Sequence, residues 1–381
     1  MEERKLTKED IDRVRDIEGF PIAKDEDIIA LSRPPYYTAC PNPFIGDFIR
    51  KYGTPYDEET DDYHREPFAA DVSEGKNDPI YNAHSYHTKV PYKAIMRYIL
   101  HYTNPGDVVL DGFCGTGMTG VAAQMCGNPD VSFKYQLENE MPGIEWGERK
   151  AILNDLSPAA TFIAYNYNTA VDGADFQKEA KRILAECENE CGWMYETQHT
   201  DEKGVPIVGI DGNPIMGRIN YTIWSDVFVC PSCSREIVFW NAAVDSDSGE
   251  VLDEFMCTQC GSKLKKRDCV RAQETLFDDL LNRTITIAKQ DPVLINYSVG
   301  KKRYNKIPDS TDKNLLGIIN QKRVTDWVPI DELPIGPNTD QPKRSHGVER
   351  AYQFLYKRAL FVFAALRKHS RSPRLYWLIT A

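Results

Sequence analysis

The chain has 381 residues, which is enough for two or three domains that each bury a core. Apolar residues make up 41% and charged residues 27%, the usual balance of a globular protein. No apolar run is as long as a membrane span, and the charged start of the chain differs from a signal peptide, so we expect no membrane partner and a cytoplasmic location. The formal net charge of −11 argues against a general polyanion binder, although a local basic face would suffice for nucleic acid.

The N-terminal part, residues 1–78, is predicted to be a helix followed by an irregular arm. Residues 7–18 are typical of a short polar helix with Thr7 as its N-cap. Residues 33–65 are rich in proline, tyrosine and acids and show no sustained periodicity.

Residues 79–200 carry the pattern of an α/β domain. Strands, turns and helices that alternate in this way indicate a parallel sheet with right-handed crossovers. The predicted elements are, in chain order, a helix over 91–103, a strand at 108–110, a glycine loop, a helix of small residues around 121–123, a strand at 151–153, a helix from about 157–158 and a helical stretch over 173–198.

The pattern changes after residue 200. Short strands and turns over 201–335 predict an inserted β-rich module. Residues 336–381 are expected to return to the α/β domain through a basic amphipathic helix, with its periodicity over 347–368.

A glycine-rich loop, DGFCGTGMTG over 111–120, follows the first strand directly. Glycines allow a sharp turn and a close approach to a ligand. Gly115-x-Gly117-x-x-Gly120 also fits the dinucleotide fingerprint, so its spacing alone does not choose the cofactor. A loop that only makes a tight turn is the remaining alternative.

The residues before these glycines carry a resemblance. Asp-x-Phe-x-Gly-x-Gly-x-Thr resembles motif I of the DNA amino-methyltransferases, with Gly112 in place of the usual proline and Met118 in place of threonine. The resemblance implies a Rossmann-like, S-adenosylmethionine-dependent methyltransferase fold, with a parallel sheet that is incomplete in this chain. It implies that the cofactor is bound by Asp111, Gly112, Phe113, Cys114, Gly115, Thr116 and Gly117, with Asp111 accepting a hydrogen bond from the cofactor's ammonium group.

Two flanking segments extend the resemblance over roughly residues 80–170. Residues 82–91 are similar to motif X, so Thr88 and Lys89 are expected to meet the methionine carboxylate of the cofactor. The alternative is a segment that only leads into the following helix. After the second strand, Asp155 is expected to accept hydrogen bonds from ribose hydroxyls, and its alternative role is to cap the next helix.

Four of the ten cysteines form a CxxC…CxxC pair. Without a secretory signal, such cysteines indicate metal ligands rather than disulfides. Aromatic and β-branched residues flank both pairs, which predicts a zinc ribbon over about 221–268, with a redox pair or an iron–sulfur site as alternatives. Four thiolates leave no open position, so the zinc is expected to be structural. The predicted ligands are Cys230, Cys233, Cys257 and Cys260.

The family's catalytic segment is Asp/Asn/Ser-Pro-Pro-aromatic, which holds the flipped base. The matching run here is Pro34-Pro35-Tyr36, preceded by Arg33, which accepts no hydrogen bond. These residues are therefore either a divergent catalytic segment or an extended arm. The apolar run at 375–381 leads us to expect the N-terminal portion of a longer enzyme or one piece of a split enzyme. A second chain or a C-terminal part would then supply the catalytic segment.

The expected partner is DNA. Residues 343–374 contain many basic residues and one acid, Glu349, and form either a phosphate-binding surface or a solvated helix face; residues 263–267 are a second basic candidate. The leading hypothesis is a methyltransferase for adenine N6 or cytosine N4, in restriction–modification or phage defence. The alternatives are a non-catalytic subunit that binds cofactor and nucleic acid, an RNA or protein methyltransferase, and a dinucleotide enzyme.

Overall fold

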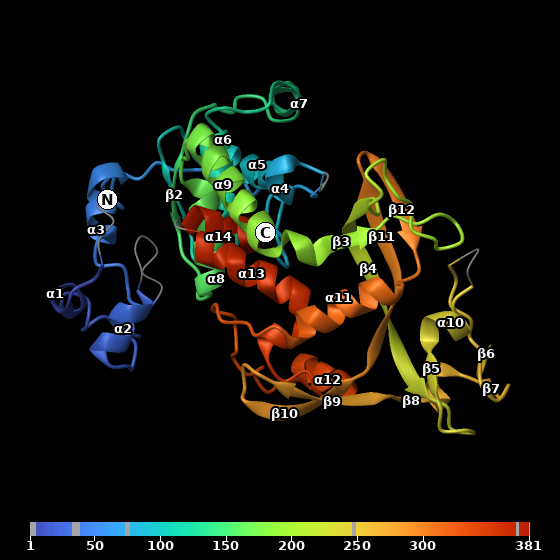
Figure 1. Cartoon of the computed structure of the whole chain (residues 1–381). Coiled ribbons are helices and arrows are strands. Elements are labelled where there is room, and N and C mark those ends of the chain that lie inside the picture. The colour runs from blue at the N-terminus through green and yellow to red at the C-terminus, as the bar shows by residue number, and fades with distance from the viewer. Residues whose placement is uncertain (1–4, 33–38, 73–76, 246–248, 371–372, 381) are drawn as a thin grey trace. The chain divides into compact units, whose positions relative to one another are not determined.

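The computed structural model describes residues 5–32, 39–72, 77–245, 249–370 and 373–380 (Figure 1). The chain divides into two compact units. The first comprises residues 1–173 and 372–381, and the second comprises residues 174–371. The expected domain boundaries after residues 200 and 335 both fall inside the second unit. No helix in the described part of the chain is long and apolar enough to cross a membrane.

The first unit is mainly helical. Thr7 caps the first helix through a capping box with Asp10, and this helix is shorter than the stretch 7–18 expected from the sequence. Its elements are α1 (Lys8–Asp12), α2 (Asp25–Leu31), α3 (Ile45–Tyr52), α4 (Pro79–Asn82), α5 (Tyr92–Tyr102), β1 (Val108–Asp111), α6 (Met118–Met125), α7 (Val131–Glu140), β2 (Lys150–Leu153), α8 (Pro158–Asn168) and α14 (Pro373–Thr380).

A small parallel sheet forms the centre of this unit. β1 and β2 pair in parallel, with Val109 opposite Ala151 and Asp111 opposite Leu153. Helices α5, α6 and α7 contribute to one core, where Met96, Ala122 and Leu137 are fully buried. The carboxyl ends of both strands therefore lie side by side, which is where ligands meet open α/β sheets.

The second unit combines helices with antiparallel strands. Its elements are α9 (Gly173–Cys191), η1 (Gly192–Tyr195), β3 (Glu196–Gln198), β4 (Met216–Val229), β5 (Glu236–Val238), α10 (Phe239–Ala243), β6 (Phe255–Met256), β7 (Lys263–Leu264), η2 (Lys266–Asp268), β8 (Val270–Arg271), β9 (Gln273–Asp278), β10 (Arg283–Ala288), β11 (Gln290–Val299), β12 (Lys302–Lys306), α11 (Ser310–Gln321), α12 (Pro337–His346), η3 (Ala351–Phe354) and α13 (Lys357–His369).

The long strand β4 organises the second unit. β12, β11, β4 and β3 form one antiparallel path, and the far end of β4 also pairs with β5 and β8 (Figure 1). β9 and β10 form a separate hairpin. Ile295 and Tyr297 of β11 are buried against Ile219 of β4, so the sheet has its own core.

Two helical predictions differ from the structure. The stretch 173–198 ends as an α-helix at Cys191, after which the chain enters η1 and strand β3. The single helix expected over 347–368 is replaced by η3 and α13, and a separate helix, α12, precedes it. Gly347 ends α12 in a left-handed conformation with φ of 72°, which an α-helix cannot continue.

Candidate cofactor loop and cysteine cluster

The glycine loop connects β1 to α6 in the first unit. Gly115 and Gly117 have φ of 52° and 74°, the left-handed region that favours glycine. A Cβ on Gly117 would lie 2.7 Å from the Cβ of Ala164 in α8, and a Cβ on Gly120 would overlap the side chain of Asn168. These glycines therefore let the loop and the start of α6 pack directly on α8.

Asp111 lies at the end of β1, and both of its carboxylate oxygens accept hydrogen bonds from the loop. Oδ1 accepts from the backbone N–H of Phe113 at 3.2 Å, and Oδ2 accepts from the hydroxyl of Thr119 at 2.5 Å. A carboxylate has about four lone-pair sites, so Asp111 keeps the capacity to accept a further donor.

Asp155 follows β2 and joins the two strand ends. Its Oδ2 accepts from the backbone N–H of Gly115 at 2.9 Å, and its Oδ1 accepts from the N–H of Ser157 at 2.8 Å. The N-cap of α8 is Ser157, whose hydroxyl accepts from the N–H of Ala160. Asp155 therefore braces the glycine loop, and the helix cap expected as its alternative role belongs to Ser157.

Two asparagines that the sequence patterns do not indicate hold the same loop. The amide of Asn154 donates to the carbonyl of Gly112 at 3.1 Å. The amide of Asn168 donates to the carbonyls of Gly117 and Ala164 at 3.0 and 2.8 Å. Asn154 stands next to Asp155 at the strand end, a position that suggests a loop contact. Asn168 has no comparable signal, because its role depends on how α8 packs.

The loop has a buried side and an exposed side. Cys114 and Thr116 are buried, whereas Phe113 is 81% exposed and Leu156, just beyond β2, is 84% exposed. Burial, with added repulsion from Asp111 and Asp155, raises the pKa of the Cys114 thiol to about 12. Cys114 is therefore a neutral thiol and a poor nucleophile, while the exposed apolar side chains are accessible to a ligand.

The segment before α5 lies beside this loop. The ring of Tyr86 would lie 3.6 Å from a Cβ on Gly115. Thr88 is exposed, has a φ of 61°, and donates its hydroxyl hydrogen bond to the carbonyl of His87. Lys89 donates to the carbonyls of Tyr81 and His84, and burial lowers its pKa. The ammonium of Lys89 thus contacts the backbone of its own loop.

Residues Pro34, Pro35 and Tyr36 lie outside the described residues. The structure therefore gives no account of the Pro-Pro-aromatic run.

The comparisons with known proteins concern this part of the chain. Residues 32–151 match the model of the N-4/N-6 DNA methylase family. The match covers motif X and the glycine loop, and it supports a DNA methyltransferase. The comparisons with curated proteins and with solved structures found no match.

The four cysteines lie beyond the methylase match, in the second unit, and the fold brings them together. Their sulfur atoms all lie within 4.8 Å of one another. Cys230 and Cys260 have sulfurs 3.8 Å apart, as do Cys233 and Cys257. Four sulfurs bound to one tetrahedral zinc ion at about 2.3 Å would be separated by about 3.8 Å, so the spacing suits such an ion.

Two tight turns present these cysteines. The N–H of Ser234 donates to the carbonyl of Cys230, and the N–H of Gly261 donates to that of Cys257. Behind the turns, Phe228, Phe239 and Phe255 make edge-to-face contacts, with ring centroids 5.5 Å apart in each successive pair. The second pair is carried by the β6–β7 hairpin.

Proposed function

We propose that this chain carries the S-adenosylmethionine-binding part of a DNA methyltransferase that acts on the exocyclic amine of adenine (N6) or cytosine (N4). The observation that carries the proposal is the convergence of Asp111 and Asp155 on one glycine loop at the carboxyl ends of two parallel strands. The methylase match over residues 32–151 supports the choice of cofactor and substrate.

The loop fits S-adenosylmethionine better than a dinucleotide. The carboxylate of Asp111 is suited to an ammonium group, and an acid at that point would repel a pyrophosphate. A Cβ on Gly112 would meet nothing within 4 Å, so the backbone there is open to a close ligand. Asp155 would bind ribose hydroxyls, and Phe113 offers an exposed apolar surface.

Bound at this loop, S-adenosylmethionine would supply an electrophilic methyl group. The base nitrogen would form the new N–C bond as the bond between the methyl group and the sulfonium sulfur breaks, which leaves S-adenosylhomocysteine. The amine would lose one proton to solvent, with no covalent enzyme intermediate. The contribution of this chain's residues is to bind and orient, because the neutral thiol of Cys114 is unsuited to attack.

A second candidate is a cofactor-binding subunit without turnover of its own. Arg33 stands where the family's catalytic segment has an acceptor, and a guanidinium accepts no hydrogen bond. Transfer of labelled methyl from S-adenosylmethionine to DNA by the purified chain supports the enzyme, whereas binding without transfer supports the subunit.

We further propose that the four cysteines hold a structural zinc ion in a zinc ribbon. All four ligands are thiolates, which leaves no position for water or substrate. The ion would tie the loop after β4 to the β6–β7 hairpin.

Calorimetric titration tests the cofactor site. We expect the chain to bind S-adenosylmethionine and not NAD. Asp111→Asn removes the negative charge but keeps the size of the side chain, and loss of a charge-assisted hydrogen bond should weaken binding roughly tenfold to a hundredfold. Asp107→Asn, at the other end of β1, is the matched control and should bind normally. Normal binding by Asp111→Asn, or preferential binding of NAD, would refute the assignment.

A further inference from the structure

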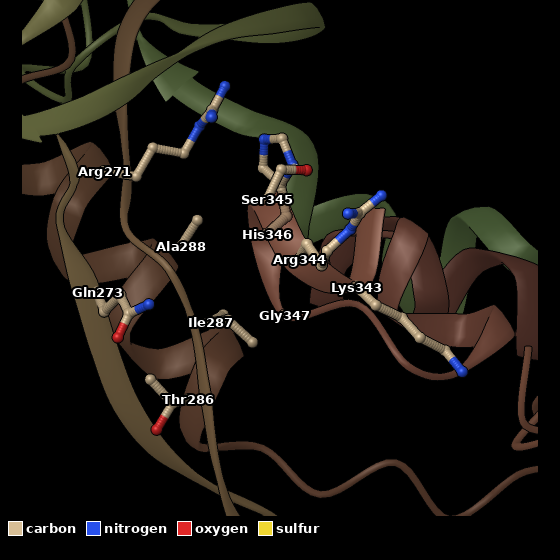
Figure 2. A pocket seen from close by; sticks show the side chains of 10 residues that line it. All are labelled: Arg271, Gln273, Thr286, Ile287, Ala288, Lys343, Arg344, Ser345, His346 and Gly347. Atoms are coloured by element: carbon tan, nitrogen blue, oxygen red, sulfur yellow. The ribbon is translucent and has the colours of Figure 1, made fainter. Parts of the chain in front are cut away.

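The second unit contains a polar cavity of about 370 Å³ between the β9–β10 hairpin and the C-terminal end of α12 (Figure 2). Side chains from β8, from the hairpin and from α12 surround it, and most of them can donate hydrogen bonds. Among the described residues, no carboxylate lines the cavity. The donor side chains are Arg271, Gln273, Thr286, Lys343, Arg344, Ser345 and His346.

An acid beside the cavity, Asp226, is already bound by its neighbours. Its Oδ2 accepts two hydrogen bonds from Arg271 at 3.0 and 3.1 Å, and its Oδ1 accepts one from Gln290 at 3.2 Å. Burial by itself raises the pKa of Asp226, but these hydrogen bonds and the charge of Arg271 lower it overall. Asp226 is therefore ionised, and it fixes Arg271 at the wall of the cavity.

The last turn of α12 brings Lys343 and Arg344 to the opposite wall. The ammonium of Lys343 donates to the carbonyl of Leu333 at 3.3 Å, whereas Arg344 is exposed. Its Nε donates to the backbone carbonyl of Asp340 at 3.5 Å, and no carboxylate in the described part of the chain pairs with it. Several other cations of the expected basic region are already engaged: Lys357 pairs with Asp279, Lys368 pairs with Glu190, and the guanidinium of Arg367 lies over the ring of Trp327.

The charge of Arg344 has one evident structural use, because cations in a last turn offset the negative end of the helix dipole. The dipole does not account for the cavity beside it. Two guanidinium groups from different elements, in a cavity that hydroxyl and amide donors also line, form a donor set that can recognise phosphate oxygens.

We propose that this cavity binds a phosphate of the DNA backbone, with Arg344 as the principal contact. The proposal rests on the proposed function, which supplies DNA as the partner. Acidic and basic residues balance within 174–371, so the acidic excess of the chain lies in the first unit and does not oppose the contact in the second. A phosphate contact would position the duplex without reading its sequence.

Fluorescence anisotropy with a labelled DNA duplex over a series of salt concentrations tests the proposal. Arg344→Gln should weaken binding about threefold to tenfold for any sequence, and it should reduce the salt dependence by about one phosphate contact. Lys313→Gln is the matched control, because it removes from α11 of the same unit one exposed positive charge that pairs with no acid among the described residues. We expect the control to bind like the natural chain.

The outcomes separate phosphate binding at the cavity from a purely structural role of Arg344. Equal binding by Arg344→Gln and the natural chain, an equal loss in Lys313→Gln, or no binding of DNA by the natural chain would each overturn the proposal. A lowered thermal midpoint of Arg344→Gln with unchanged DNA binding would assign Arg344 to the helix dipole alone. Tighter competition by inorganic phosphate than by unlabelled duplex would assign the cavity to a free anion. Titration of the same samples with S-adenosylmethionine reports separately on the proposed function.

Discussion

Asn168 connects three parts of the candidate cofactor site through one side chain. Its amide group donates to the carbonyl of Gly117 and to that of Ala164, and its oxygen accepts from Gln124 in α6. Gly117 adopts a left-handed conformation whose carbonyl needs a donor in a fixed place. Asn168 therefore supports the shape of the loop without lying in it.

Replacing Asn168 with aspartate should weaken cofactor binding. The substitution keeps the size of the side chain but directs carboxylate oxygens at two carbonyl oxygens, which we expect to displace the loop. Calorimetry should find S-adenosylmethionine bound about tenfold more weakly, equivalent to roughly 1.4 kcal/mol.

Asn166→Asp provides the comparison for this variant. The amide of Asn166 donates to the carbonyl of Phe162 within α8 at 2.8 Å, in the same way that Asn168 donates to Ala164, and among the described residues it has no bond to the loop. Equal losses of affinity in the two variants would mean that α8 has merely been destabilised, and the positioning role of Asn168 would be abandoned.

For single residues, the sequence pattern identifies site residues at strand ends more readily than residues whose role depends on packing. Asp111 and Asp155 follow apolar strands directly, so their meeting at one sheet edge can be expected from the strand pattern alone. The hydrogen bonds of Lys89 to two backbone carbonyls cannot be expected from the sequence, because they depend on the path of residues 81–89.

Helix α12 packs against strand β10 through a glycine. Gly347 has a φ of 72°, and a Cβ there would overlap the backbone carbonyl of Thr286. The glycine thus has two separate functions, to end the helix and to allow its close approach to the hairpin. Both determine the width of the cavity proposed to bind phosphate.

Alanine at position 347 should destabilise the second unit more than alanine at position 300. Gly300 has a similar φ of 58° and open space around its Cα. Gly300→Ala should therefore cost only the left-handed strain of about 1 kcal/mol, whereas Gly347→Ala adds the steric overlap, about 1–3 kcal/mol more. Chemical denaturation measures both values, and equal losses would show that close packing at Gly347 is unimportant.

Local patterns identified the strands and missed the helix break. An apolar triplet followed by glycines, as at 108–110, has few alternatives to a strand. The apolar periodicity over 347–368 continues across residues that the structure divides between η3 and α13. Gly347, at the start of this stretch, ends the preceding helix α12 and contacts β10, a segment about sixty residues away that no local pattern reports.

The proposed cofactor and the proposed zinc ion belong to different units of the molecule. The cofactor loop lies in the first unit and the cysteine cluster in the second, and each unit has its own core. Helix α9 follows the cofactor-binding segment in sequence but belongs to the second unit, where Glu188 pairs with Arg218 and Glu190 with Lys368. A sequence pattern can locate a helix but does not say which core the helix joins. The domain boundary expected after residue 200 therefore differs from the boundary between the two units, which follows residue 173.

Loss of the metal should therefore leave cofactor binding intact. We expect Cys257→Ser to release zinc, measured by elemental analysis, and to lower the thermal midpoint while the affinity for S-adenosylmethionine stays the same. Cys269→Ser is the control, because Cys269 packs against the cluster but is not one of its four members. Zinc retained by Cys257→Ser would rule out the ribbon, and a parallel loss of cofactor affinity would contradict the independence of the two sites.

Strand β4 adds a mechanical property to the second unit. It is 14 residues long, or roughly 45 Å, pairs with β3 over 216–218 and with β11 over 218–226, and ends one residue before Cys230. Each part of this strand is paired with at least one neighbouring strand, and a paired strand resists bending more than a loop. The cysteine cluster is thus joined directly to a paired strand. A force applied to the ribbon would be transmitted to the six-stranded sheet rather than absorbed by a flexible linker.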